Sequence, residues 1–429
     1  MACQVKLDMT TFTTSLIHWQ EKDKDCSAIW RSERGAPPPK RVVIADDTLS
    51  ADSAYRLACA GTGLLWRGDF QNAKLLLAAM ARRIDKVPDR KKRKATKPAA
   101  ALQATPDGAL QAPAADELAA QAFHLHRQAQ AQRARVLSCI LIPFDANYGI
   151  PLRRAPDAKL ACQEAWGEPE ASGELNAAAL NSVASLRELM GVTSAHEWRK
   201  KGVEIGALGK IGSTANNRIH PHYGVFSPVR GEYINLVHRA EFPSAFFERT
   251  RFVAFDIGTG TGVLAAVLTR REVTHIVATD SDTRAMICAR ENLTKLGVIE
   301  HIKLTEVDLF PEGKASLIVC NPPWLPARPS SPIERAVYDE GGKMLAGFLA
   351  GLAAHLAPNG EGWLLLSDIA EHLGLRSRDE LLAMFKAGGL KVLNRTDARP
   401  EHPKAEDSSD PLYAARSKEV TSLWRLVAA

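Results

Sequence analysis

The second half of the chain alternates between short apolar runs and segments with helical spacing of apolar residues. Apolar runs that alternate with helices predict strands of a parallel sheet whose two faces are both covered. The expected strands lie at 251–257, 275–280, 302–309, 315–320, 362–369, 391–396 and 421–427. The expected helices lie at 262–271, 282–297, 343–357 and 378–389. This pattern predicts an α/β domain with ligand-binding loops at the carboxyl ends of its strands.

The first 240 residues follow a different pattern. Apolar residues at helical spacing predict two helices within 48–85 and further helices at 118–137 and 174–200, and an apolar run predicts a strand at 136–144. Residues 201–237 contain short β-like segments separated by glycine and asparagine turns. We therefore expect five regions: a helical N-terminal region at 1–86, a flexible basic Ala/Pro-rich linker at 87–117, a mainly helical region at 118–200, a β-rich connector at 201–240 and the α/β domain at 241–429.

Composition places the chain among globular, soluble proteins. It has 429 residues, of which 45% are hydrophobic and 24% are charged. No run approaches the ~20 apolar residues of a membrane span, and the first residues lack the pattern of a signal peptide. The seven cysteines are scattered without a C-x-x-C pair, and the histidines are not clustered. We therefore expect no metal site, no disulfide framework, no membrane partner and a cytoplasmic location.

The positive charge of the chain is unevenly distributed. Residues 241–429 contain 22 Lys and Arg against 25 Asp and Glu, whereas the first 240 residues contain 33 against 24. The expected linker includes the basic cluster Arg90–Lys94. A basic N-terminal half suggests an anionic partner such as nucleic acid. Solvated helix faces would explain the same surplus equally well.

A glycine-rich loop joins the first expected strand of the α/β domain to its helix. The segment FDIGTGTGVL, residues 255–264, lacks the third glycine of the dinucleotide-binding pattern, because Val263 stands at that place. Asp256 would repel a phosphate but suits an ammonium group, and Asp280 lies where two ribose hydroxyls can be bound. An amino group and a ribose without phosphate fit S-adenosylmethionine better than NAD. The glycines of the loop are Gly258, Gly260 and Gly262.

A second unusual corner follows the expected strand at 315–320. It has the sequence NPPW, and its candidate site residues are Asn321, Pro322 and Trp324. Two consecutive prolines remove two backbone donors and forbid a helix. The corner could be a plain strand end or a preorganised binding site. It follows another strand of the same expected parallel sheet and therefore lies at the same edge of the sheet as the glycine loop.

Together these segments resemble the class I S-adenosylmethionine-dependent methyltransferases of the small-domain type. That group includes release-factor glutamine methyltransferases and guanine-N2 ribosomal RNA methyltransferases. The resemblance rests on DIGTGTG (256–262), ATDSD (278–282), VDLF (307–310) and IVCNPPW (318–324), and it covers about residues 220–429. It implies a Rossmann-like, seven-stranded methyltransferase sheet with helices on both faces, preceded by a mainly helical region and a short β segment.

The resemblance also implies roles for individual residues. Asp256 and the backbone of the three glycines would hold the methionine part of S-adenosylmethionine, Asp280 its ribose and Asp308 the adenine amino group. Asn321 and the carbonyl of Pro322 would bind the substrate nitrogen, and Trp324, where the family most often has Tyr, would stack on its planar group. The segment 224–237, with Pro228, Arg230 and Glu232, would cover the methionine end.

The implied reaction is methyl transfer to a planar amino or amide nitrogen. The motif is shared by enzymes that act on adenine N6, guanine N2 and the glutamine amide, so it does not separate these substrates. The basic N-terminal half slightly favours nucleic acid, RNA above all, and a base there must be flipped out or single-stranded. Two alternatives stay open: methylation of a protein glutamine, as in a release factor, and an inactive S-adenosylmethionine-binding protein.

Overall fold

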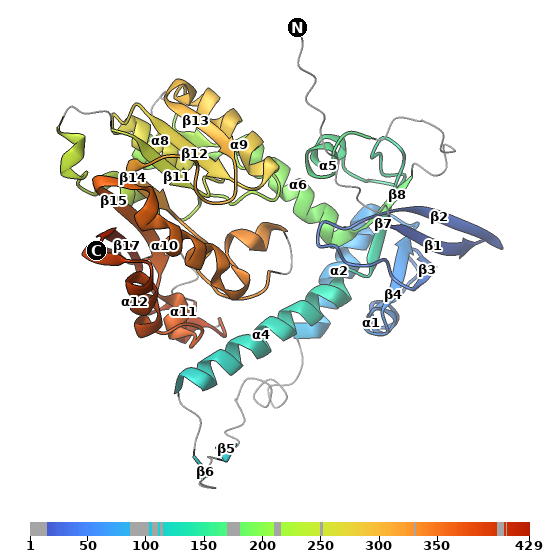
Figure 1. Cartoon of the computed structure of the whole chain (residues 1–429). Helices are drawn as coiled ribbons and strands as arrows, with labels where there is room; N and C mark the ends of the chain where they lie inside the picture. The colour runs from blue at the N-terminus through green and yellow to red at the C-terminus, as the bar shows by residue number, and fades with distance from the viewer. Residues whose placement is uncertain are drawn as a thin grey trace. The chain divides into compact units, whose positions relative to one another are not determined.

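The chain divides into two compact units (Figure 1). The first consists of Met1–Lys86 and Gln132–Thr193, and the second of Val87–Ala131 and Ser194–Ala429. The predicted boundary at residue 86 lies at the end of one of these segments, but each unit combines two separate stretches of chain. The computed structural model describes residues 15–85, 103–104, 110–111, 115–169, 181–209, 216–248, 252–329, 332–400, 407–408 and 410–429.

The first unit is built around a six-stranded sheet in the order β1-β2-β8-β7-β4-β3. Strands β3, β4 and β7 run parallel, whereas β1 with β2 and β7 with β8 are antiparallel pairs. The strands are β1 (Leu16–Glu21), β2 (Lys24–Arg31), β3 (Arg41–Ala45), β4 (Thr62–Trp66), β7 (Ile140–Phe144) and β8 (Ser182–Ser185). The helices are α1 (Ala51–Cys59), α2 (Phe70–Asp85) and α5 (Lys159–Trp166), and the unit boundary falls within α4 (Ala115–Leu137) and α6 (Leu186–Lys201).

Helices are present in the segments predicted for the N-terminal half, but residues 182–185 of the helix expected at 174–200 form the strand β8, and α6 begins only at Leu186. The six-stranded sheet comes in addition to these helices. The two helices expected within 48–85 are α1 and α2, and the expected strand at 136–144 is β7. The sequence analysis did not foresee β4, which runs between the two helices at the glycine break. A Cβ at Gly63 would lie 2.8 Å from the Leu141 side chain, so this glycine permits close packing of β4 on β7. Such short strands carry too few residues for their alternation to be recognised.

The second unit contains a seven-stranded sheet in the order β13-β12-β11-β14-β15-β17-β16, which confirms the predicted fold. The first five strands of this order run parallel, and β17 and β16 are antiparallel to their neighbours. The strands are β11 (Ala254–Ile257), β12 (Ile276–Asp280), β13 (Ile302–Glu306), β14 (Ala315–Cys320), β15 (Leu356–Ser367), β16 (Leu390–Ala398) and β17 (Thr421–Ala428).

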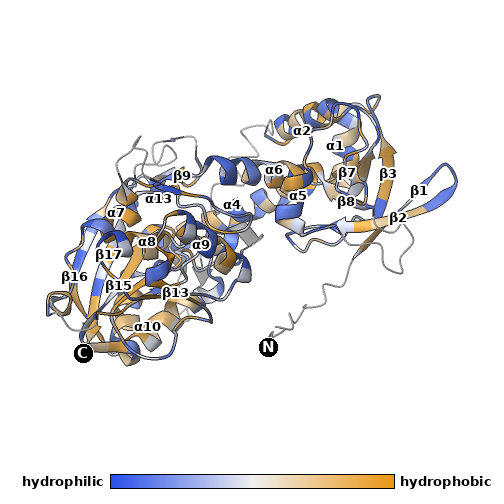
Figure 2. Cartoon of the chain, turned by 90° about the horizontal axis from the view of Figure 1, so that it is seen from above, coloured by the Kyte–Doolittle hydropathy of each residue, from blue (hydrophilic) through white to orange (hydrophobic). Residues whose placement is uncertain are grey.

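Helices cover both faces of this sheet because neighbouring residues of a strand point to opposite sides. Ala254 and Leu317 pack on the side of α7, α8 and α9, whereas Phe255 and Ile318 pack on the side of α10 and α12. Figure 2 shows hydrophobic central strands and hydrophilic stretches in the edge strand β16. The helices are α7 (Glu232–Arg239), α8 (Val263–Arg270), α9 (Thr283–Lys295), α10 (Lys343–His355), α11 (Ile369–His372), α12 (Arg378–Ala387) and α13 (Tyr413–Arg416).

The remaining short elements lie outside the two sheets. The β segment expected in the connector is the pair β9 (Val203–Glu204) and β10 (Arg218–Ile219). Most of the expected linker at 87–117, including Arg90–Lys94, lies outside the described residues, and its described parts include the pair β5 (Gln103–Ala104) and β6 (Leu110–Gln111). No helix in the described parts of the chain combines the length and apolar character that crossing a membrane requires. Short 3-10 turns lie at Gly206–Leu208, Ser244–Phe246, Ile299–His301, Pro332–Ala336 and Glu340–Gly342.

Candidate active site

The glycine loop and the Asn-Pro-Pro-Trp corner leave neighbouring strands at the same level. In the parallel pair of β11 and β14, Ile257 lies opposite Cys320. The next residues along the chain are Gly258 and Asn321. Neighbouring strands lie about 4.8 Å apart, so the two loops begin side by side at the carboxyl edge of the sheet. The structure therefore brings together the two segments that the sequence analysis singled out.

The glycine loop has a backbone that other residues adopt only with strain. A Cβ at Gly258 would lie 2.5 Å from Cε of Met344, whereas nothing lies within 4 Å of a Cβ at Gly260. The open space at Gly260 leaves room for a ligand to approach the peptide groups. All three glycines are in the left-handed region, with φ of 70°, 54° and 81° at Gly258, Gly260 and Gly262.

Asp256 stabilises the glycine loop through hydrogen bonds to its buried side chain. Its side chain is buried, with 1% of the residue exposed. Its Oδ2 accepts the hydroxyl of Thr259 at 2.6 Å and the N–H of Ala265 at 3.1 Å. Burial raises the pKa of Asp256 to about 6, and the two hydrogen bonds oppose that rise. The carboxylate therefore links the glycine loop to the first turn of α8 and places a negative charge next to the loop.

Asp280 ends β12 and binds the same loop from the side. Its Oδ2 accepts the N–H of Gly260 at 3.0 Å, and its Oδ1 accepts the N–H of Asp282 at 3.0 Å. Burial raises the pKa of Asp280, and these backbone hydrogen bonds oppose the rise. A carboxylate has about four lone-pair sites. It can therefore hold the loop and still accept hydrogen bonds from a ligand hydroxyl group.

Asp308 lies on the third neighbouring loop of the same edge. It follows β13 by two residues and is exposed. The adjacent Leu309 has a φ of 60°, and its carbonyl accepts the hydroxyl of Thr279 at 2.7 Å. This bond holds the loop of Asp308 against the end of β12. The three acids predicted for the cofactor therefore lie within, at the end of and just after three adjacent strands.

These residues fit the adenosyl cofactor expected from the sequence. The resemblance assigns the carboxylate of Asp256 to an ammonium group and those of Asp280 and Asp308 to hydroxyl or amino groups. The open space at Gly260 lies on the loop whose N–H group Asp280 accepts. Among the described residues, no group of three or more His, Cys, Asp or Glu could hold a metal ion.

At the Asn-Pro-Pro-Trp corner, the side chains of the first and last residues contact one another. Pro322 is buried, while Asn321 and Trp324 are partly buried. The indole N–H of Trp324 donates to Oδ1 of Asn321 at 3.0 Å. An amide oxygen has two lone pairs, so one remains for another donor. The corner presents the Asn321 oxygen and the Pro322 carbonyl on a rigid backbone without competing N–H groups.

Arg230 packs on this corner, which the sequence analysis did not foresee. Its guanidinium lies 4.8 Å from the centre of the Trp324 ring, a cation–π distance. The same group donates to Glu232 at 2.5 Å and to Glu419 at 3.0 Å. Glu419 also accepts the hydroxyl of Ser367 at 2.7 Å. The segment expected at the methionine end therefore places its arginine on the acceptor corner.

The chain after the corner is fixed by a second set of contacts. Leu325 forms a parallel bridge with Tyr338, and the guanidinium of Arg127 lies 4.1 Å from the Tyr338 ring centre. Asp339 is buried and accepts the N–H of Met344 at 2.8 Å at the start of α10. No local sequence signal links Arg127 or Arg230 to this corner. Both stand far from it along the chain.

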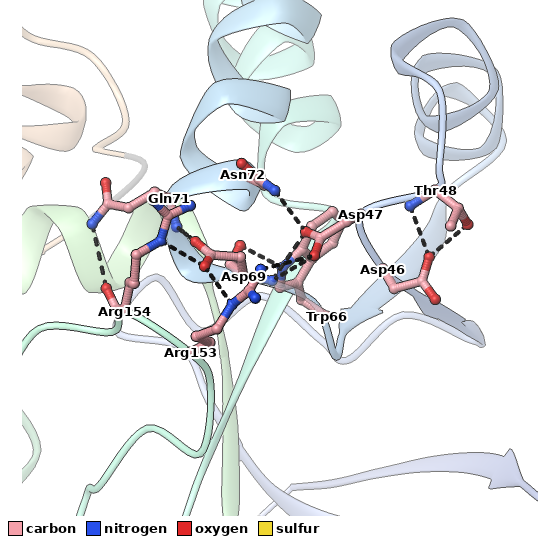
Figure 3. Close-up of polar contacts among 9 residues, drawn as sticks. All are labelled: Asp46, Asp47, Thr48, Trp66, Asp69, Gln71, Asn72, Arg153 and Arg154. Carbon is pink, nitrogen blue, oxygen red and sulfur yellow. Dashed lines mark hydrogen bonds and ion pairs between the residues drawn. The ribbon is translucent and has the colours of Figure 1, made fainter.

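The first unit has its own polar cluster at the carboxyl ends of β3 and β4 (Figure 3). Asp69 is buried, and its Oδ2 accepts Nε of Arg153 at 2.9 Å and Nε of Arg154 at 2.6 Å. The hydrogen bond from Arg154 is the largest cause that lowers the pKa of Asp69 to about 2. Asp47 accepts the backbone N–H of Asp69 at 3.0 Å and an amide N–H of Asn72 at 3.0 Å. These contacts join three loops, so we interpret the cluster as structural.

Comparisons with known proteins agree with this reading of the second unit. Residues 216–386 match the family model described as methyltransferase small domain. The release factor glutamine methyltransferase of Cereibacter sphaeroides is 32% identical over 176 residues, which cover 38% of this chain and 58% of that protein. The ribosomal protein L11 methyltransferase of Brucella suis is 34% identical over 145 residues, which cover 33% of this chain and 45% of that protein.

The matched segment spans about half the length of these two relatives. Among solved structures, the ribosomal protein L11 methylase of Lactobacillus delbrueckii aligns with a TM-score of 0.34 and 15% identity, over 52% of this chain and 93% of that one. The glycine loop, the three acids and the Asn-Pro-Pro-Trp corner all lie within the matched residues. Residues 216–386 of this chain are therefore similar to the family described as methyltransferase small domain.

Proposed function

We propose that the chain transfers a methyl group from S-adenosylmethionine to a planar amino or amide nitrogen. The observation that carries the proposal is the register of β11 and β14, which starts the glycine loop and Asn321 side by side. A donor bound on the glycine loop and an acceptor bound at Asn321 would then be neighbours. Methyl transfer between bound partners depends above all on such positioning.

The acceptor nitrogen is a weak nucleophile because its lone pair is delocalised into a ring or a carbonyl. The Asn321 oxygen and the Pro322 carbonyl accept its two N–H groups and direct the remaining lone pair towards the methyl group. Trp324 stacks on its plane. S-adenosylmethionine, when bound, supplies a methyl group on a sulfonium that is already a good leaving group. The protein residues therefore bind, orient and exclude water.

The hydrogen bond from Trp324 gives this corner a feature that a tyrosine would not provide. The indole N–H fixes which side of the Asn321 amide presents oxygen. The second lone pair of that oxygen then points to a defined place. An acceptor N–H meets a preoriented partner, which reduces the ordering that binding requires.

For the acceptor we propose a base in nucleic acid, guanine N2 or adenine N6, with RNA as the first candidate. The support is the basic surplus of the first 240 residues, 33 Lys and Arg against 24 Asp and Glu. A protein glutamine is the second candidate. Its support is the similarity to a release factor glutamine methyltransferase and a ribosomal protein L11 methyltransferase, whose names state protein substrates.

The test is transfer of radiolabelled methyl from S-adenosylmethionine to a cell lysate, with the Asn321→Ala variant as control. Binding of S-adenosylhomocysteine to both proteins, measured by calorimetry, separates cofactor binding from transfer. Label that nuclease removes supports the base, and label that protease removes supports the glutamine. Equal label with both proteins, although both bind S-adenosylhomocysteine, would overturn the proposal and leave an inactive binding protein.

A further inference from the structure

A groove of about 880 Å³ lies between α7 and the strands β16 and β17. Its volume is within the range of about 300–1,000 Å³ usual for ligand sites. Asn235 contributes from α7, and Asn394 and Thr396 contribute from β16. These two β16 residues are two positions apart and therefore face the same side of the sheet. The groove thus lies on the α7 side of the sheet, at the edge strand.

One end of this groove opens at the edge of the sheet that carries the active site. Ala398, at the end of β16, lies opposite Thr421, which in turn lies opposite Ser367 at the carboxyl end of β15. β15 is the neighbour of β14, which leads into Asn321. Three strand spacings of about 4.8 Å separate β16 from β14, so the groove end lies roughly 14 Å from the acceptor corner.

Arg230 connects the groove with the acceptor corner directly. It lines the groove, and its guanidinium also lies 4.8 Å from the Trp324 ring centre. Ion pairs with Glu232 and Glu419 hold the guanidinium group of Arg230 between the groove and the Trp324 ring. A chain molecule that lies in the groove would therefore reach the indole on which the acceptor stacks.

The side chains that line the groove carry one more positive than negative charge. Four arginines line it, and two of them are paired: Arg230 as described, and Arg425 through two bonds of 2.7 Å to Glu361. The exposed Arg239 and Arg399 have no ion-pair or hydrogen-bond partner among the described residues. Of the acids that line the groove, Glu232 pairs with Arg230, Asp397 pairs with Arg395, and Glu241 is exposed.

We propose that this groove binds the phosphodiester backbone of a single-stranded nucleic acid whose target base lies at the Asn321 corner. The inference rests on the proposed methyltransferase function and adds a second binding surface to it. Guanidinium groups match phosphate through paired N–H donors. Single-strand sites combine such a basic groove with an aromatic side chain on which bases stack. Arg239 and Arg399 supply the first element, and Trp324 supplies the second.

A peptide is the competing occupant, and the lining of the groove fits it less well. Peptide sites depend on buried apolar or aromatic anchor pockets. Among the described residues that line this groove, none is aromatic, and the large apolar ones are Val229 and Leu236. The charged side chains of the groove without an ion pair to a described residue are those of Arg239, Arg399 and Glu241. Charge complementarity therefore favours an anionic backbone.

The test measures binding of the full chain to a fluorescein-labelled oligouridylate by anisotropy over a series of salt concentrations. The double variant Arg239→Ala/Arg399→Ala removes the two unpaired charges. Each phosphate contact on a single strand contributes about 0.7 to the slope of log affinity against log salt, so the double variant should lose about 1.4 of that slope. The matched control is Lys303→Ala/Lys314→Ala, which removes one exposed lysine from the opposite edge strand β13 and one exposed lysine just before β14, and it should keep the wild-type slope.

The outcomes separate this inference from the proposed function. An unchanged slope in the arginine variant, or equal losses in both double variants, would overturn the groove while methyl transfer remained. Absence of oligouridylate binding together with binding of an acidic peptide that needs Arg239 and Arg399 would assign the groove to a protein substrate and overturn the nucleic-acid inference. Binding of S-adenosylhomocysteine, measured on the same samples, should be equal in all variants and reports that each protein is folded.

Discussion

The buried carboxylate of Asp256 should destabilise the fold at neutral pH, and Asp256→Asn should remove that cost. Burial raises its pKa from 3.8 to about 6. At about 1.4 kcal/mol per pKa unit, the shift corresponds to about 3 kcal/mol. An asparagine has nearly the same shape, and its oxygen can accept the same two N–H and O–H groups. We therefore expect the variant to be more stable than the wild type at pH 7.5, by up to about 3 kcal/mol.

The sign of the pH dependence follows from the raised pKa. An acid whose pKa is higher in the folded state binds protons preferentially there, so its unfavourable contribution is fully present above pH 6. That contribution fades as the pH falls and is gone below about 3.8, where the group is protonated in both states. The advantage of Asp256→Asn should therefore shrink between pH 6 and pH 4.

The assay is urea denaturation followed by circular dichroism at pH 4, 5, 6 and 7.5. The wild-type transition that S-adenosylhomocysteine shifts upward belongs to the second unit, because a ligand stabilises the unit that binds it. Glu312→Gln, at an exposed carboxylate, is the control and should change stability by less than about 0.5 kcal/mol. A difference between Asp256→Asn and the wild type that stays constant from pH 4 to pH 7.5 would refute the reasoning.

Four further substitutions test other parts of the structure. Gly260→Ala should lower the free energy of unfolding by about 1–2 kcal/mol, because its φ is left-handed but its surroundings are open. Gly258→Ala should lower it further, because the added Cβ would also meet a methionine side chain. Equal unfolding free energies of the two variants would contradict this expectation. Trp324→Phe keeps the stacking surface but loses the bond to Asn321, so we expect methyl transfer to fall while S-adenosylhomocysteine binding is retained; an unchanged rate would show that the bond does not orient the amide. Asp69→Asn should lower the melting temperature of the first unit at pH 7. This effect should shrink as the pH falls from about 4 towards 2, since the pKa of Asp69 is lowered to about 2. An equal change of the melting temperature at pH 4 and pH 2 would exclude a role for the charge of Asp69.

Much of the second unit could be predicted from the sequence because its signals are local. Apolar strands that alternate with helices specify a parallel sheet, and its strand ends lie at one edge. The glycine loop and the Asn-Pro-Pro-Trp corner each occupy a few consecutive residues. Their place at that edge follows from the pattern alone. The register then showed that Ile257 and Cys320 lie opposite one another, which the sequence only implied.

The first unit shows where local patterns were not enough. Its sheet combines strands from both ends of the unit, with β8 between β2 and β7. Strands of four to eight residues gave no pattern strong enough to predict most of them. The cluster of Asp69, Arg153 and Arg154 likewise joins residues more than eighty positions apart.

By itself, the sequence determined the glycine loop of this protein and the rigid Asn-Pro-Pro-Trp corner, since backbone constraints from glycine and proline act within a few residues. Only the tertiary structure decided what surrounds that corner. Arg230 and Glu419 are 189 positions apart, yet they form one ion pair beside Trp324. The groove also required α7 and β16 to come together. Contacts between such distant residues depend on how the whole sheet and its helices pack, and no short segment encodes them.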